Sequence, residues 1–157
     1  MKNVSMTVEE LLKKSTDTFS TLNISSEEAQ VVEACTRKQS TSKTWFEQRS
    51  GRVTASKFKQ ACTTNPDSPS KSLVMMVCCP EAHAFSNAAT KWGIDNESKA
   101  RQAYEFMIAD QHSNLSVADC GLHINEKWPF LEASPDGLVF CECCGNGACE
   151  IKCPYKF

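Results

Sequence analysis

The feature that most constrains the fold of this 157-residue chain is the order of its hydrophobic patterns. Helical periodicity comes first, and strand patterns follow. Two helices separated by a polar turn are predicted within the first forty residues, the second with Ser25 as its cap. A longer helix, capped by Asn87, is predicted over residues 88–109. Strand patterns come after it, at 115–124, 130–132, 137–140 and 149–153. The last two predict a hairpin, and the whole order predicts an α+β fold.

The composition fits one globular domain with a buried core, since 41% of the residues are hydrophobic and 23% are charged. The net charge of -2 excludes a generally basic nucleic-acid binder, so any contact with DNA has to be local. No apolar run reaches the length of a membrane span, and the N-terminal residues lack a signal-peptide pattern. We therefore expect an intracellular protein, nuclear or cytoplasmic.

Ten cysteines are too few for the disulfide scaffold of a small secreted protein, which takes about 8–10% cysteine. Half of them lie between residues 141 and 153. A structural zinc ion is one interpretation, with Cys141, Cys143, Cys144 and Cys149 as its ligands. The Cys-x-Cys-Cys spacing lacks the paired knuckles of most zinc sites, so free thiols are favoured. No site is suggested by the scattered histidines His83, His112 and His123.

Asp136, Glu150 and Lys152 have the chemistry that metal-dependent phosphodiester hydrolysis needs. Carboxylate oxygens suit a hard divalent cation, and an amine offsets the charge that develops on the phosphate. Within a strand, Glu150 and Lys152 would project to one face. The Pro135-Asp136-Gly137 turn could aim the aspartate at the same place. An ordinary half-exposed edge strand beside a common turn has the same spacing, so spacing alone leaves both interpretations open.

The register of the hairpin decides whether these three residues can meet. With a two-residue turn at Asn146-Gly147, Cys141 would face Lys152 and Asp136 would lie about 16 Å beyond, at about 3.3 Å per residue. A shared metal site instead requires Asp136 to pair near Glu150. That register leaves residues 141–147 as a protruding loop.

Four blocks of the sequence form one ordered set. They are the lead-in residues Glu33, Thr36, Arg37, Gln39 and Ser40; the segment Trp45–Ser56; the segment Trp92–Glu97; and Ala133–Leu138 followed by Glu150–Tyr155. In this order they resemble the YqaJ viral recombinase and lambda-exonuclease family of the restriction-endonuclease-like nucleases. The resemblance implies a restriction-endonuclease-like core, which is a small mixed sheet flanked by helices. It also implies hydrolysis of DNA, from a 5′ end, in recombination, repair or mobile-element replication, with Mg²⁺ or Mn²⁺ as the cofactor.

The resemblance also implies roles for individual residues. The implied metal ligands are Asp136, Glu150 and, from the long helix, Glu97, and Lys152 would orient or activate the attacking water. Arg49 and Ser56 match residues that hold the 5′ phosphate of a DNA end, for which a guanidinium and a hydroxyl are suited. For Trp45 and Trp92 we expect core packing. Family relatives form trimers, although no interface residue can be identified in this sequence.

Residues 1–40 are expected to form a helical lead-in and residues 41–157 the nuclease domain. Family members continue past the last block with further helices, so we expect this domain to be truncated at its C-terminus. One alternative is a DNA-binding module without catalysis, which would use the local basic residues Arg49, Arg52, Lys57 and Lys59. The other alternative is a zinc-stapled interaction domain built on the cysteine cluster.

Overall fold

A computed structural model describes residues 6–83 and 87–155. Residues 1–5, which belong to the N-terminal segment that lacks a signal-peptide pattern, lie outside the described residues. Its α-helices are α1 (Val8–Ser20), α2 (Ser26–Cys35), α3 (Lys43–Arg49), α4 (Ala55–Thr63), α5 (Lys71–Cys78) and α6 (Ala88–Ile108). Three short 3-10 helices are η1 (Gln39–Thr41), η2 (Glu81–His83) and η3 (Ala109–Gln111). The strands are β1 (Val53–Thr54), β2 (Ser116–Ala118), β3 (His123–Ile124), β4 (Leu131–Ala133), β5 (Gly137–Cys141) and β6 (Gly145–Cys149).

Side-chain caps fix where the predicted helices begin. The Ser25 hydroxyl accepts from the backbone N–H of Glu28, and the Glu28 side chain accepts from the Ser25 N–H in return, which is a capping box. Helix α1 starts with the same device. The Asn87 side chain accepts from the backbone N–H of Thr90 at 2.7 Å. The two N-terminal helices and the long helix are therefore confirmed.

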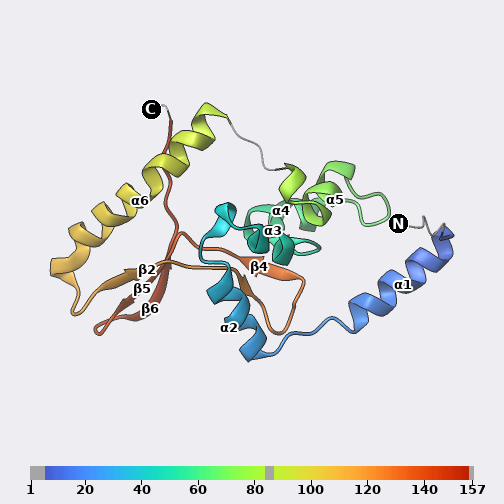
Figure 1. Ribbon diagram of the computed structural model, residues 1–157, viewed down its shortest axis with the longest axis horizontal. Coiled ribbons are helices and arrows are strands. Elements are labelled where there is room, and N and C mark those ends of the chain that lie inside the picture. The colour runs from blue at the N-terminus through green and yellow to red at the C-terminus, as the bar shows by residue number, and fades with distance from the viewer. Residues whose placement is uncertain (1–5, 84–86, 156–157) are drawn as a thin grey trace.

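The strands form two small sheets, which confirms the predicted α+β class. One has the order β1-β4-β3, with β1 parallel to β4 and β3 antiparallel to it. The other is the antiparallel sheet β2-β5-β6. In Figure 1, helices α2 to α5 gather around the first sheet and α6 lies beside the second, while α1 stands apart at the far end. The segment predicted as strand at 115–124 divides between the two sheets, because residues 119–122 cross from one to the other.

The core lies between α2, α3 and the β1-β4-β3 sheet. Trp45, Leu122 and Ile124 are buried there, and they pack with the half-buried side chains of Ile24, Val32 and Phe46. Trp45 is only 8% exposed, which confirms its predicted place in the core. Burial of such aromatic and aliphatic side chains contributes most of the stability of a small domain.

The prediction for Trp92 is wrong, because this side chain on α6 is 45% exposed. Met107 on the same helix is 73% exposed, and α6 has no fully buried residue. The physical reason is the small size of its partner. Helix α6 is 21 residues long and packs against β2, a strand of three residues, which covers only part of one face.

The hairpin of β5 and β6 has the predicted register but a different turn. Gly137 pairs with Cys149 and Cys141 with Gly145, so the loop contains three residues, 142–144, rather than the seven expected. Gly145 has a φ of +82°, a left-handed conformation that glycine adopts without strain and that closes three-residue loops. Strand β6 ends at Cys149, so Glu150 and Lys152 follow the strand instead of lying within it.

No helix that the structure describes is long and apolar enough to cross a membrane.

Candidate active site

Asp136 and Glu150 come together at the open end of the hairpin. The backbone N–H of Asp136 donates to the carbonyl of Cys149 at 3.1 Å, one residue beyond the last ladder pair. Asp136 therefore stands opposite the segment that carries Glu150, which is the pairing that a shared site requires. The backbone N–H of Ile151 donates to Oδ2 of Asp136 at 2.5 Å. This bond fixes the aspartate carboxylate against the segment between Glu150 and Lys152.

Glu150 and Lys152 form an ion pair, so their side chains lie together as expected, although both residues follow β6 and the strand geometry assumed for them is not the cause. Their side chains are 60% and 75% exposed. The hydrogen bond to Glu150 raises the pKa of Lys152, which keeps the amine protonated. A cationic amine at this place can offset negative charge that develops on a bound phosphate.

Glu97 joins the two carboxylates from α6. Burial raises the pKa of Glu97, and the negative charges of Asp136 and Glu150 raise it further, while Arg101 and Lys152 oppose the shift. Acids that raise the pKa of a neighbour form a site whose repulsion a divalent cation can relieve. The donor set fits Mg²⁺ or Mn²⁺ by its chemistry. In the part of the chain that the structure describes, the carboxylate oxygens of Glu97, Asp136 and Glu150 do not all lie within 4.8 Å of one another.

Two neighbouring cavities divide the predicted site residues between them. A cavity of about 210 Å³ is lined by Glu97 and Asp136, and one of about 160 Å³ by Arg49, Ser56 and Glu150. Gln39 lines both cavities. Of the predicted metal ligands, Glu150 thus shares a cavity with the predicted phosphate-binding residues, whereas Glu97 and Asp136 line the neighbouring one.

Arg49, which lines the smaller cavity, is held by contacts with two residues. Its guanidinium carbon lies 3.8 Å from the centre of the Trp45 ring, a cation–π contact, and its Nε lies 3.3 Å from Oε1 of Glu132. Arg49 Nε and both carboxylate oxygens of Glu132 are buried and form no hydrogen bond with a described residue. Burial lowers the pKa of Arg49, and the charge of Glu132 raises it. The Arg49 guanidinium is therefore held in place where it can bind an anion, although the Glu132 carboxyl already lies beside it.

Sequence reasoning missed Glu132. Burial raises the pKa of this carboxyl to about 7, and Arg49 and Arg52 oppose the shift. Its neighbours in β4 are Leu131 and Ala133, so the signal available was an acid flanked by apolar residues in a strand that alternation places inward. Such an acid needs a buried partner, and Arg49 is that partner.

Ser56 lies in the first turn of α4, whose N-cap is Thr54. The two hydroxyl oxygens are 3.0 Å apart. Ser56 faces the cavity that also holds Arg49, so the two predicted phosphate-binding residues are brought together. Hydroxyls near a helix N-terminus and a guanidinium that line one cavity are complementary to a phosphate.

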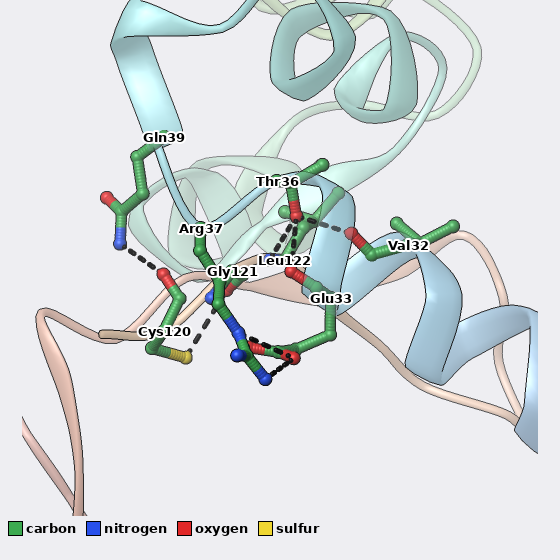
Figure 2. A network of polar contacts seen from close by, with 8 residues as sticks. All are labelled: Val32, Glu33, Thr36, Arg37, Gln39, Cys120, Gly121 and Leu122. Carbon is green, nitrogen blue, oxygen red and sulfur yellow. Dashed lines mark hydrogen bonds and ion pairs between the residues drawn. The ribbon is translucent and has the colours of Figure 1, made fainter. Parts of the chain in front are cut away.

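The lead-in residues tie the helical half of the chain to residues 120–122, as Figure 2 shows, and Gln39 also reaches the turn that carries Asp136. The Gln39 side-chain amide donates to the carbonyl of Cys120 at 2.9 Å, and also to the carbonyl of Pro135 at 3.1 Å. Because Pro135 immediately precedes Asp136, Gln39 helps to place the aspartate turn. Sequence reasoning noted Gln39 only as part of a resemblance.

The cysteine cluster differs from the predicted set by one ligand. Cys141, Cys143 and Cys144 come together, but their fourth neighbour is His112 and not Cys149. The expectation that the histidines suggest no site is therefore wrong for His112. A sequence pattern could not reveal it, because the histidine precedes Cys141 by 29 residues.

Comparison with known proteins identifies the kind of domain. Residues 44–157 match the YqaJ-like viral recombinase domain. The crystal structure of an alkaline exonuclease (LHK-Exo) from Laribacter hongkongensis is similar, with a TM-score of 0.54 and 30% identity over 73% of this chain and 55% of that one. The structure of LHK-Exo in complex with dAMP gives 0.55 and 32% over 73% and 54%. These likenesses confirm the predicted restriction-endonuclease-like fold. This chain spans about half the length of those proteins, and no curated protein matches it.

Proposed function

Since the chain belongs to the family of YqaJ-like viral recombinase domains, we propose that it is a metal-dependent DNA nuclease domain that acts on DNA ends in recombination. The observation that carries this proposal is the convergence of Asp136, Glu150 and Lys152 at the open end of one hairpin, with Glu97 beside them. The likeness to an alkaline exonuclease supports the same class of reaction.

In this proposal the carboxylates of Glu97, Asp136 and Glu150 hold Mg²⁺ or Mn²⁺. When bound, such an ion polarises a phosphoryl oxygen and lowers the pKa of a water molecule. Asp136 is already oriented by the Ile151 N–H. Glu150 would exchange its ion pair for the cation, which frees the Lys152 amine to orient the water and to offset charge on the phosphate. Arg49 and Ser56 would receive the 5′ phosphate of the DNA end in the adjacent cavity.

The alternative of a DNA-binding module without catalysis is less well supported, because Arg52 is already engaged within the protein. Arg52 donates to the carbonyl of Pro129 at 2.9 Å and to the carbonyl of Gln48. Arg49, Lys57 and Lys59 remain of the expected basic stretch, and so few phosphate contacts give weak binding.

Cleavage assays with the purified chain and linear duplex DNA test the proposal. We expect cleavage that requires Mg²⁺ or Mn²⁺ and that falls by about 100-fold or more in Asp136→Asn and Glu150→Gln, because each variant removes a charged ligand without emptying the core. Glu47→Gln on the exposed face of α3 is the matched control and should cleave like the parent. DNA binding without cleavage by the parent would instead favour the binding module.

Arg49 is tested by changing the DNA end. Arg49→Ala should slow cleavage of 5′-phosphorylated duplexes by about tenfold or more and affect 5′-hydroxyl duplexes far less, because the guanidinium binds the terminal phosphate and takes no part in the chemistry. Lys59→Ala, an exposed cation on α4, should affect both ends alike. An equal loss on both ends in Arg49→Ala would contradict the phosphate role.

A further inference from the structure

Four side chains near the tip of the hairpin converge on one point. The sulfurs of Cys143, Cys141 and Cys144 lie 3.3, 3.4 and 3.6 Å from Nδ1 of His112. The sulfur of Cys143 lies 3.5 Å from that of Cys141 and 3.7 Å from that of Cys144. All four ligand atoms fall within 4.8 Å of one another.

These separations match the edges of a zinc tetrahedron. With zinc–sulfur bonds of about 2.3 Å and zinc–nitrogen bonds of about 2.0–2.1 Å, two sulfurs are about 3.8 Å apart and a sulfur and a nitrogen about 3.5 Å apart. The nitrogen–sulfur distances of 3.3 to 3.6 Å and the sulfur–sulfur distances of 3.5 and 3.7 Å in the structure lie close to those values. A cation at the centre would therefore need little movement of the side chains.

Hydrogen bonding among the four groups does not account for the arrangement. One imidazole nitrogen carries either one proton or one lone pair, so Nδ1 of His112 can form one good hydrogen bond. Three sulfurs nevertheless approach it within 3.6 Å. A single central cation satisfies all four atoms at once.

The topology explains why residues so far apart in sequence meet. Strand β2 pairs with β5 up to Ser116 and Phe140. Beyond that pair, the backbone N–H of Glu142 donates to the carbonyl of Ser113 at 2.9 Å, which holds the hairpin loop against the residue after His112. Loop residues Cys143 and Cys144 and the last β5 residue, Cys141, then face the histidine.

We infer that His112, Cys141, Cys143 and Cys144 form a structural zinc site. Three thiols lose their protons on binding, and the four protein ligands complete the tetrahedron, which leaves no open position for a substrate or water. The site would join the segment that follows α6 to the hairpin, so it would brace the two elements that carry Glu97 and Asp136. Sulfur-rich ligation selects zinc over Mg²⁺, which keeps this site distinct from the carboxylates.

A second group, Glu33, Cys120 and His123, is also close enough to share an ion. Its carboxylate is already occupied, because Arg37 donates to both Glu33 oxygens and the Gly121 N–H donates to Oε1 (Figure 2). We therefore assign no metal to that group.

Metal analysis of the purified chain tests the inference. After loading with Zn²⁺ and dialysis against metal-free buffer, the parent should retain about one zinc per chain. Cys143→Ser and His112→Ala should retain almost no zinc. His112→Cys replaces the imidazole ligand with a fourth sulfur ligand, so it should retain the parental amount. Cobalt in place of zinc should give the charge-transfer band of thiolate ligation and the visible bands of tetrahedral coordination in the parent, and neither in Cys143→Ser.

Three controls separate this site from other zinc. Cys149→Ser distinguishes the ligand set from one built on cysteines alone, Cys62→Ser tests an exposed thiol elsewhere, and Glu150→Gln tests the carboxylate site. All three should keep the zinc. Absence of zinc from the parent, or equal retention by the parent, Cys143→Ser and His112→Ala, would overturn the inference. Because none of these readouts depends on cleavage, a failure here is distinguishable from a failure of the proposed nuclease function.

Discussion

Gly121 permits the closest approach between two parts of the backbone. A Cβ atom at this position would lie 1.8 Å from the carbonyl oxygen of Glu33 and 2.7 Å from Oγ1 of Thr36. Both belong to the end of α2, and neither is the mobile end of a long side chain. Only glycine at position 121 therefore lets the segment of residues 119–122 that crosses between the two sheets, the crossing segment, lie against this helix.

Gly121→Ala should lower the free energy of unfolding by about 3 kcal/mol or more, since the helix and the crossing segment must separate to admit one methyl group. Gly93→Ala on α6 is the matched control, because a Cβ there meets nothing within 4 Å. Alanine in an exposed helix should raise stability by about 0.5–1 kcal/mol. Denaturant unfolding of both variants measures the contrast, and equal effects would contradict the steric argument.

Glu132 makes stability depend on pH. Its pKa is raised from 4.5 to about 7 by burial, so the folded state binds the proton more tightly than the unfolded state. The stability that this proton contributes is complete below pH 4.5 and is lost as the pH rises through about 7. At 1.36 kcal/mol per pKa unit, the loss is on the order of 3 kcal/mol.

Unfolding of the parent and of Glu132→Gln across this pH range isolates the effect, because other titrating groups cancel in the difference. The stability of the parent relative to Glu132→Gln should fall steadily from pH 4.5 to about 7. A difference that stays flat, or that rises with pH, would show that the carboxyl is ionised throughout and paired with Arg49.

At the scale of elements, α2 is fastened to the segment that leads into β3 by polar bonds in the core. Thr36 is fully buried, and its hydroxyl donates to the Val32 carbonyl at 2.6 Å and accepts from the Leu122 N–H at 2.8 Å. A second bond runs from the Gly121 N–H to Glu33 Oε1 at 3.0 Å. These contacts give the lead-in residues of the family resemblance a physical role, which is to hold the helix against the sheet.

Thr36→Val should cost about 1–3 kcal/mol of stability, because valine keeps the shape but leaves the buried Leu122 N–H without an acceptor. Thr36→Ser keeps the hydroxyl and loses one methyl group, so it should cost clearly less. Thermal or denaturant unfolding ranks the two. A larger loss in the serine variant would mean that packing, and not the hydrogen bond, is the main contribution of Thr36.

Sequence predicts the elements whose signals are local. Helices α1, α2 and α6 have caps and periodicity within a few residues of their first turns. Strand β1 has two residues, and its pairing with β4 lies far along the chain, so no local pattern announces it. The chemistry of Asp136 and Glu150 predicts the hairpin register. The partners of Arg49 and of the cysteines depend on the tertiary fold, which explains why Glu132 and His112 were missed.

At the scale of the whole molecule, stability is distributed unevenly. All residues of α1 are exposed. Its Phe19 contacts Phe130 with ring centres 5.2 Å apart. The buried cluster of Trp45, Leu122 and Ile124 instead packs with Val32 of α2 and Phe46 of α3. Segments with little buried surface open with small free energies, and core segments open only with global unfolding.

Amide hydrogen exchange should therefore be fastest in α1 and slowest in α2 and at Gly121 and Leu122, whose N–H groups bond to buried acceptors. Exchange followed by mass spectrometry of peptic fragments resolves these segments. Protection of α1 equal to that of α2 would show that the first helix is stabilised by contacts beyond those described.

The bonds between α2 and the crossing segment also have a consequence for how the protein is made. They join residues 86 and 88 positions apart, so their acceptors leave the ribosome long before their donors. At about 5–20 residues per second, Glu33 and Thr36 wait roughly 4–18 s for Gly121 and Leu122. During that interval Val32 and Trp45 have helices around them but no sheet to pack against. The core around Trp45 can therefore form only after Gly121, Leu122 and Ile124 have been synthesised, so folding of this part of the nascent chain is delayed until its second half is made.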